Sequence, residues 1–213
     1  MYTRKIYLIR HGATPGNLQG RYVGGTDEGL TEEAKMLLSR KDKLEGRVYT
    51  SPMKRCIQTA GCLCASHGYM VVEGWRERDF GAFEYKNYRE LKEDGRYQRW
   101  IDSNGTLPFP EGEDEVSFYK RCLDGFTEML LAEEAYGIDG TVICILHGGV
   151  IMALLSKLRD GGSFYDYRCK NAEGYVFTCC WEDAGSPKLM AAARLESEEE
   201  SDGWLQTAMV FRT

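Results

Sequence analysis

The chain alternates short, almost wholly apolar runs with longer segments in which apolar residues recur every three or four positions. The two clearest apolar runs are residues 4–9 and residues 141–146. A run of this kind is typical of a parallel strand buried on both faces, whereas the longer spacing is typical of an amphipathic helix. The sequence therefore predicts strands that alternate with helices.

Helix-start signals place the helices between the strands. Thr31, which two glutamates follow, predicts an N-cap for a helix that runs to about Leu44, and Ser51-Pro52 predicts the start of a second helix. Residues 150–158 are typical of a buried helix, and residues 114–136 of an amphipathic one. The residues expected on the apolar face of the latter are Val116, Tyr119, Cys122, Leu123, Phe126, Met129 and Leu130.

The remaining strands are expected at residues 47–50, 71–72, 175–181 and 204–211. This alternation predicts an α/β fold, a three-layer α/β/α sandwich around a mostly parallel central sheet. We expect residues 1–213 to form one domain. A lid-like insertion is expected around residues 82–113, where a polar, aromatic and helical stretch precedes a loop with two prolines.

The net charge and its distribution indicate which kinds of partner are not expected. The chain has 213 residues and a formal net charge of −6, and an acidic run between Glu196 and Asp202, expected to be a solvated loop, supplies most of it. A broad basic face for nucleic acid or an anionic membrane is therefore not expected. No apolar run approaches the roughly 20 residues of a membrane span or the core of a signal peptide. We expect a cytoplasmic protein.

The eight cysteines do not suggest a disulfide framework or a zinc site. Cys56, Cys122 and Cys144 lie within apolar helix or strand patterns, so we expect them to be small core residues. The other close pairs, which lack a second ligand pair at zinc-site spacing, are Cys62/Cys64 and Cys179/Cys180. We therefore expect neither a metal nor a cofactor.

Two of the three histidines follow the two apolar runs. His11 and His147 are each followed by glycine, while the third, His67, is expected only to end a helix. In open α/β sheets, ligands bind outside the carboxyl ends of the parallel strands. Packing alone does not explain two imidazole rings at equivalent strand ends, because each ring must satisfy two nitrogens. We interpret them as functional.

Histidine and arginine together favour phosphate chemistry. A neutral imidazole can attack phosphorus to give a covalent phosphohistidine, which water later hydrolyses. The planar guanidinium group pairs with two phosphoryl oxygens and offsets their charge during transfer. Arg10 directly precedes His11, and Arg55 lies near the start of the second helix. These residues suggest a phosphate-handling site.

Four sequence blocks carry a family resemblance. They are residues 8–17 (LIRHGATPGN) with their continuation to Thr31, residues 51–60 (SPMKRCIQTA), residues 77–81 (ERDFG) and residues 146–148 (LHG). In this order, each at a predicted strand end or helix start, they resemble the signatures of the histidine phosphatase, or phosphoglycerate mutase-like, superfamily. The alignable blocks span residues 4 to about 158.

The resemblance implies a role for each matching residue. His11 is expected to be phosphorylated, Arg10, Arg55 and His147 to surround the phosphoryl group, and Glu77 to protonate the leaving oxygen. Residues expected to complete the substrate-binding lining are Thr14, Asn17, Gly24 and the backbone N–H of Gly148. The partner implied is a small phosphomonoester.

Hydrolysis is favoured over isomerisation. The resembling mutases carry a longer insertion after the glutamate block, whereas about 35 residues separate Glu77 from the turn at residues 111–113 here. The basic residues of this stretch, which include no adjacent arginine pair, are Lys86, Arg89, Lys92, Arg96 and Arg99. Phosphoglycerate mutase stays the alternative.

The turn at residues 109–113 resembles that of the small phosphatase branch, which includes alpha-ribazole phosphatase. Alpha-ribazole 5'-phosphate is thus a candidate substrate. Asp114, Val23 and Gly29 depart from the pattern of that branch, so the substrate rim is expected to differ. The lid aromatics, which either stack on a substrate ring or pack on their own hinge, are Tyr85, Tyr88, Tyr97 and Trp100.

Two further hypotheses belong to other classes. One is a phosphate-binding module without turnover, which the presence of all five expected catalytic groups disfavours. The other takes the two histidines and Glu77 as metal ligands. Two neighbouring arginines would repel a divalent cation, which disfavours this reading.

Overall fold

The computed structural model describes residues 1–66, 68–103, 105, 107–159 and 161–196. Its centre is a six-stranded sheet with the order β3-β2-β4-β1-β5-β6. The strands are β1 (Tyr2–Arg10), β2 (Arg47–Thr50), β3 (Met70–Val71), β4 (Thr141–Leu146), β5 (Gly174–Trp181) and β6 (Lys188–Leu195). The first four run parallel, and β5 pairs antiparallel with both β1 and β6.

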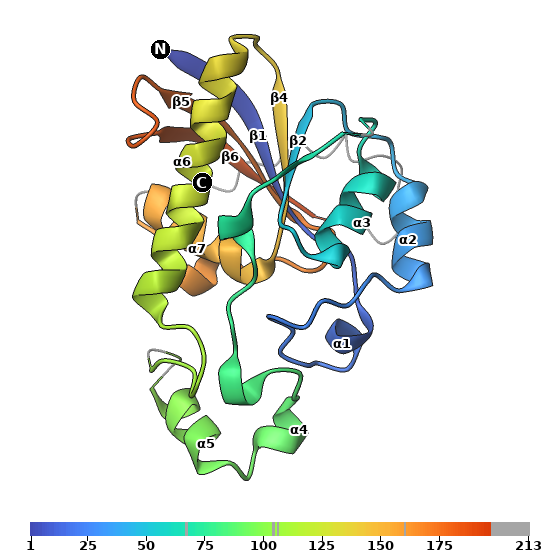
Figure 1. Ribbon diagram of the computed structural model, residues 1–213, viewed down its shortest axis with the longest axis vertical. Helices are drawn as coiled ribbons and strands as arrows, with labels where there is room; N and C mark the ends of the chain where they lie inside the picture. The colour runs from blue at the N-terminus through green and yellow to red at the C-terminus, as the bar shows by residue number, and fades with distance from the viewer. Residues whose placement is uncertain (67, 104, 106, 160, 197–213) are drawn as a thin grey trace.

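Helices cover both faces of this sheet, which confirms the predicted fold class (Figure 1). On one face lie α6 (Glu115–Tyr136) and α7 (Gly148–Leu158), and on the other α2 (Glu32–Ser39) and α3 (Lys54–Leu63). The alternation along β1 explains the layers. Ile6 and Leu8 join the apolar cluster with α6 and α7, while Tyr7 and Ile9 join the cluster with α3.

The insertion lies beyond the carboxyl ends of the strands, at the lower end of Figure 1. It contains the short helices η2 (Gly81–Phe83), α4 (Tyr88–Leu91) and α5 (Gly95–Asp102). A small apolar cluster of its own holds it together, formed by Phe83, Leu91, Tyr97 and Phe109. The insertion is therefore a packed subdomain rather than an open loop. We call residues 82–113 the lid.

Several element boundaries differ from the predictions. The helix after Thr31 ends at Ser39 rather than Leu44, because Leu44 pairs with Cys64 in an isolated bridge. The helix predicted from Ser51-Pro52 begins at Lys54. It ends at Leu63 rather than at the expected His67, and Cys64, its C-cap, forms the bridge to Leu44.

The apolar face of α6 and the last strands also differ. Val116 is 78% exposed, and fully buried Phe118 takes its place in the core. Strand β6 was not predicted at residues 188–195, and the strand predicted at residues 204–211 lies outside the described residues, as does most of the acidic run. Cys56, Cys122 and Cys144 are buried as expected.

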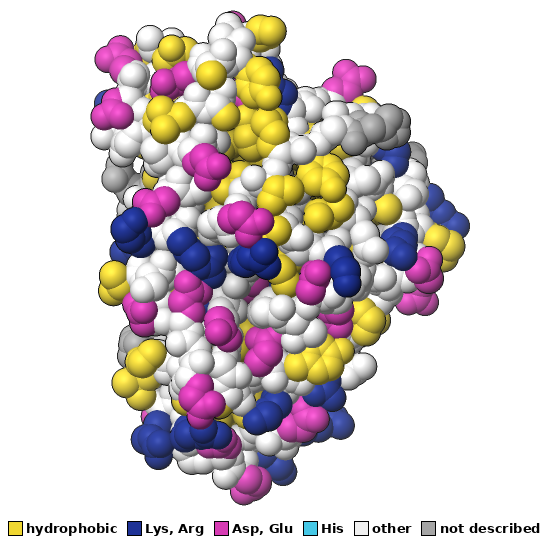
Figure 2. All heavy atoms as spheres, in the orientation of Figure 1, with side chains coloured by type: hydrophobic (Ala, Val, Ile, Leu, Met, Phe, Trp, Pro, Cys, Tyr) yellow, Lys and Arg dark blue, Asp and Glu magenta, His cyan; other side chains and the backbone are white. Residues whose placement is uncertain are grey.

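Two further features concern possible partners. Across the described part of the chain, no helix is both long and apolar enough to cross a bilayer. Figure 2 shows acidic and basic side chains interspersed over the visible face, without a broad basic area.

Candidate active site

The two functional histidines meet at the carboxyl ends of neighbouring parallel strands. Arg10 ends β1 and pairs in register with Leu146, the last residue of β4, so the residues that follow lie side by side. The ring centroids of His11 and His147 are 5.2 Å apart. His147 also occupies the N-cap position of α7. The structure thus brings together two residues that are 136 positions apart in the sequence.

His11 has one nitrogen engaged and one available. Its Nδ1 lies 2.7 Å from the carbonyl oxygen of Gly12. A carbonyl only accepts, so Nδ1 carries the proton and Nε2 keeps its lone pair. Burial, followed by the charges of Arg55 and Arg10, lowers the pKa of His11 well below its ordinary value. The imidazole is therefore neutral and nucleophilic at neutral pH.

His147 has both ring nitrogens engaged. Arg55 donates from Nε to His147 Nδ1 over 3.2 Å, so His147 Nε2 carries the proton and donates to Ser51 Oγ over 2.7 Å. Burial, with the charges of Arg55 and His11 next, lowers the pKa of His147 well below its ordinary value. The ring is held neutral, in one tautomer.

The two arginines expected to bind phosphate differ in whether their N–H donors are already engaged. Arg10 donates from Nη1 to the carbonyl oxygen of Cys169, but its buried Nε has no hydrogen-bond partner. Arg55 is fully buried. Besides His147, it donates to the backbone carbonyls of Val23, Gly24 and Thr26. Arg10 thus presents an unused donor, while Arg55 supports the loop at residues 23–26 from behind.

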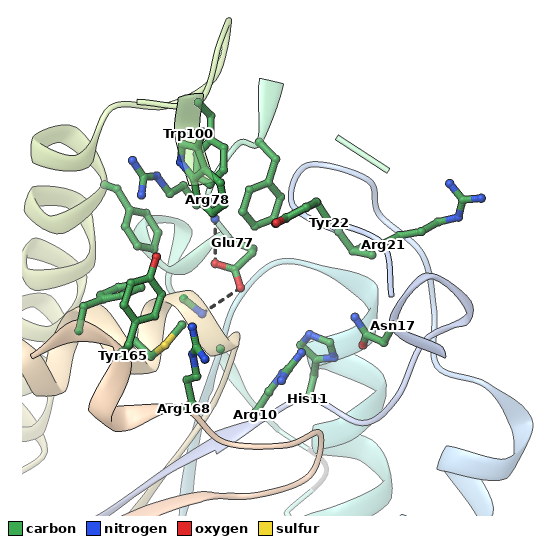
Figure 3. A pocket seen from close by; sticks show the side chains of 18 of the residues that line it. Arg10, His11, Asn17, Arg21, Tyr22, Glu77, Arg78, Trp100, Tyr165 and Arg168 are labelled. Carbon is green, nitrogen blue, oxygen red and sulfur yellow. Dashed lines mark hydrogen bonds between the residues drawn. The ribbon is translucent and has the colours of Figure 1, made fainter. Parts of the chain in front are cut away.

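Glu77 lies across the cavity from His11 (Figure 3). Its two carboxylate oxygens accept hydrogen bonds from the backbone N–H groups of Arg78 (2.9 Å) and of Gly149 (3.1 Å), in the first turn of α7. A Cβ at Gly149 would lie only 2.3 Å from Glu77 Oε1, so glycine is needed for this close approach. Glu77 is therefore held in a fixed position across the cavity from His11.

The expected substrate-binding residues divide into two groups. Asn17 and Gly148 line the cavity together with Arg10, His11 and Glu77. Thr14 is fully buried and caps α1 (Pro15–Leu18), where its hydroxyl accepts from the Asn17 N–H. The Gly24 N–H donates to Glu84 over 3.0 Å. Thr14, Gly24, Arg55 and His147 lie behind the cavity wall in this structure, and their contact with substrate stays a prediction.

The cavity measures about 450 Å³, within the range of small-molecule sites. Its floor is the histidine site. The lid contributes Trp100, Ile101 and Phe109 to its wall, and the segment between α7 and β5 contributes Phe164, Tyr165 and Arg168. The lid's exposed Tyr85 and Tyr88 do not line it, and buried Tyr97 packs within the lid. Of the lid aromatics predicted to stack or pack, Trp100 alone faces the cavity.

Several cavity residues were not among the predicted ones. They are Arg21, Tyr22, Arg78, Tyr165 and Arg168, with apolar neighbours. Arg78 and Tyr22 stand inside sequence blocks that signalled the site, so proximity in sequence could have found them. No local pattern marks Tyr165 and Arg168, because their position depends on how the chain returns from α7 to β5.

The charges around the cavity suit an anion. Four arginines line it, at positions 10, 21, 78 and 168, against the single carboxylate of Glu77. Within the described ranges, no cluster of three or more His, Cys, Asp or Glu side chains is arranged to hold a metal ion. The site therefore has the charge and the nucleophile for phosphoryl transfer.

The chain is similar to known proteins of two different activities. The chain is 38% identical to a 2,3-bisphosphoglycerate-dependent phosphoglycerate mutase of Corynebacterium diphtheriae, with 75% of this chain and 79% of that protein covered. It is 28% identical to phosphoserine phosphatase 1 of Hydrogenobacter thermophilus, with 79% and 83% covered.

Solved structures and the family model agree on the fold. A putative alpha-ribazole-5'-P phosphatase from Escherichia coli superposes with a TM-score of 0.68 at 19% identity, covering 87% of this chain and 94% of that one. The model of the histidine phosphatase superfamily (branch 1) matches residues 6–185, which include His11, Arg55, Glu77 and His147. With the sandwich fold and the paired histidines, this match shows that the chain belongs to the histidine phosphatase superfamily.

Proposed function

We propose that the protein is a phosphomonoesterase that acts on a small phosphorylated metabolite through a phosphohistidine at His11. The observation that carries the proposal is the neutral His11 ring, whose unengaged Nε2 shares a cavity with the unpaired Nε of Arg10. An arginine donor beside the nucleophile suits the phosphoryl oxygens.

The reaction proceeds in two balanced steps. In the first, His11 Nε2 attacks phosphorus, the P–O bond to the leaving group breaks, and protonated Glu77 gives its proton to the departing oxygen. In the second, water attacks phosphorus, the P–N bond breaks, and the Glu77 carboxylate takes a proton from the water. Inorganic phosphate leaves, and both His11 and Glu77 return to their starting states.

The lid supports hydrolysis rather than isomerisation. A mutase must hold a phosphorylated sugar acid in a closed cavity while it reorients, which calls for basic residues on the lid as well as on the other walls. None of the lid's five predicted basic residues lines the cavity in the described part of the chain, and the lid side chains that do so are apolar. Arg96, for example, pairs instead with Asp94 and Glu111.

Phosphoglycerate mutase is the second candidate function. The observation that favours it is the 38% identity to the corynebacterial mutase over most of both chains. Alpha-ribazole 5'-phosphate stays a candidate substrate, supported by the turn at residues 109–113 and by the aromatic wall at Trp100. A cytoplasmic location and the lack of a nucleic-acid or membrane partner stay predictions.

Product analysis tests the proposal. The wild-type protein, in the presence of a chelator, is given p-nitrophenyl phosphate, alpha-ribazole 5'-phosphate and 3-phosphoglycerate. We expect phosphate release, with a loss of at least about a thousandfold in His11→Ala. Mass spectrometry is expected to find acid-labile phosphate on His11. A matched control is Lys120→Ala, on the exposed face of α6, which should keep wild-type rates.

The alternative outcomes are distinct. Isomerisation of 3-phosphoglycerate without release of phosphate would identify a mutase. Binding of phosphate esters with neither product would identify a module without turnover. Release that survives in His11→Ala would exclude His11 as the nucleophile.

A further inference from the structure

One cavity wall, which adjoins the lid where Tyr165 meets Gly105, is built from the segment between α7 and β5. This segment contains the short helix η3 (Phe164–Tyr167), and Arg168 follows it. Tyr167 and Cys169, on either side of Arg168, are buried in the main core. Because Arg168 is in an extended conformation between these two anchors, its side chain is directed away from the core. In Figure 3 it points into the cavity between Tyr165 and Arg10.

The guanidinium group of Arg168 is available for a ligand. It lies 4.5 Å from the ring centroid of Tyr165, and it makes no hydrogen bond or ion pair with any residue of the described ranges. Each of the other cavity arginines already donates to another residue, although Arg10 keeps its Nε free beside His11. Arg21 pairs with Glu90, and Arg78 donates to the Glu113 carbonyl. Arg168 thus carries an uncompensated charge and a full set of N–H donors.

The position of this charge separates it from the phosphoryl site. The phosphoryl group is bound beside His11 and Arg10, on the cavity floor. Arg168 belongs to the outer wall with Phe164 and Tyr165, where the part of the substrate that leaves must lie. Arg78, 9% exposed and held between the rings of Phe109 and Phe118, adds a second cation near this wall without a carboxylate partner. A monophosphate with a neutral leaving group leaves these charges unmatched.

We propose that Arg168 is a specificity-determining residue that binds a second anionic group, a carboxylate or a further phosphate, on the leaving portion of the substrate. The inference rests on the proposed phosphomonoesterase function, and it narrows the substrate to phosphate esters with two anionic groups. It therefore disfavours alpha-ribazole 5'-phosphate, whose leaving portion carries no anion. Guanidinium binds both kinds of oxyanion through the same pair of parallel N–H donors.

Matched substrate pairs test this inference. sn-Glycerol 3-phosphate and 3-phosphoglycerate differ only in a hydroxymethyl group against a carboxylate. Fructose 6-phosphate and fructose 1,6-bisphosphate differ in a second phosphate. We expect the wild type to prefer, in kcat/KM, the member with the second anionic group in at least one pair, and the pair that shows the preference identifies the kind of anion. The rate for each substrate is the sum of phosphate released and isomer formed.

The variants assign the preference to one side chain. Arg168→Ala is expected to lower kcat/KM for the preferred member by about tenfold or more, and to leave the member without the second anionic group within about twofold. Arg168→Lys should restore part of the loss, because the charge remains but the planar fork is absent. The control is Arg159→Ala, which removes an arginine that also lies over a tyrosine ring but is not among the described cavity residues. It should change neither substrate pair.

Two failures are distinguishable. If p-nitrophenyl phosphate and the esters without a second anionic group are hydrolysed, but no pair shows a preference that Arg168→Ala removes, this inference is wrong. The phosphomonoesterase function then stands. An equal loss on both members of a pair would likewise show that Arg168 has a structural role alone. If no phosphate ester of any kind reacts, the function fails, and the inference falls with it.

Discussion

At the scale of single residues, the two active-site histidines differ in the state of their ring nitrogens. His11 uses Nδ1 to donate to the Gly12 carbonyl and leaves Nε2 unengaged, whereas His147 has both nitrogens engaged by Arg55 and Ser51. Equivalent positions at two strand ends thus hold one ring with a free nitrogen and one ring without. The proposed reaction also needs a proton for the leaving group, and it assigns this role to Glu77.

The proton-donor role of Glu77 predicts a dependence on the leaving group. Glu77→Gln removes the proton but keeps the shape, so esters with poor leaving groups, such as glycerol 3-phosphate, should lose about 10²- to 10⁴-fold in kcat. p-Nitrophenyl phosphate should lose far less, because nitrophenolate leaves without protonation. Steady-state kinetics on both substrates measure the ratio.

The matched control for Glu77 is Glu73→Gln, an exposed carboxylate that pairs with Arg76 at the surface. It should leave both rates unchanged. Equal losses on the two substrates in Glu77→Gln would contradict the acid role and indicate that the hydrogen bonds from Arg78 and Gly149 hold the wall in place.

At the scale of elements, the contact between η1 (Glu73–Trp75) and α6 positions Glu77. The Trp75 indole donates to the Cys122 carbonyl in α6, and the two backbones approach at glycines. A Cβ at Gly125 would lie 2.8 Å from Val72 Cγ1 and 2.9 Å from Trp75 Nε1. This crossing leaves no room for a methyl group.

Glycine-to-alanine changes in two helices should therefore have opposite signs. Gly125→Ala should lower the free energy of unfolding by about 1–3 kcal/mol, because it overpacks the crossing. Gly61→Ala, in α3 with nothing within 4 Å of the added Cβ, should raise it by about 0.5–1 kcal/mol through helix propensity. Urea unfolding measures both. A loss of stability in both variants would show that packing at the crossing is not the cause.

Local patterns predicted most elements that form the cavity floor, because strand runs, caps and the residues that follow them are adjacent in sequence. These patterns failed where contact with a segment distant in the sequence determines the local structure. The segment of β6, KLMAAARL, favours a helix by composition, but it forms a strand because it pairs with β5. Its Ala191 has a φ of 49° beside the register shift in that pairing. Arg168 escaped prediction for the same reason, since its place in the cavity depends on Tyr167 and Cys169 packing in a distant core.

At the scale of the whole molecule, charges are balanced near the start of the parallel strands and mostly positive in the cavity at their carboxyl ends. Near the start of the strands, Arg4 and Arg47 both pair with the buried carboxylate of Glu133, which also accepts from Tyr49. At the carboxyl ends, the cavity arginines outnumber the one carboxylate. The chain is acidic overall, at −6, yet its cavity is positive. Repulsion within this cavity also disfavours protonation of the two histidines.

Acid should destabilise the fold through these histidines. Burial and neighbouring cations lower the pKa values of His11 and His147 in the folded protein. In the unfolded chain both have the ordinary histidine pKa of about 6.5. Below that pH the unfolded state binds more protons, so the free energy of unfolding should fall as pH falls, approaching about 1.4 kcal/mol per pH unit for each histidine. Above it, this contribution should be constant.

Urea unfolding at a series of pH values on both sides of the ordinary histidine pKa measures the slope. His11→Asn should reduce it by about half, since one of the two groups is removed. A slope unchanged by this substitution would show that His11 is not buried in its neutral form.

The cavity joins a floor and two walls of different origin, which has a consequence for how new selectivities arise. The floor residues follow β1 and β4, whereas much of the wall comes from the lid and from residues 164–168, each one continuous stretch of chain. A stretch of this kind can be exchanged as a block by recombination while the phosphoryl-transfer groups keep their places. Libraries confined to these two stretches therefore test directly whether substrate choice can change while the floor residues stay in place.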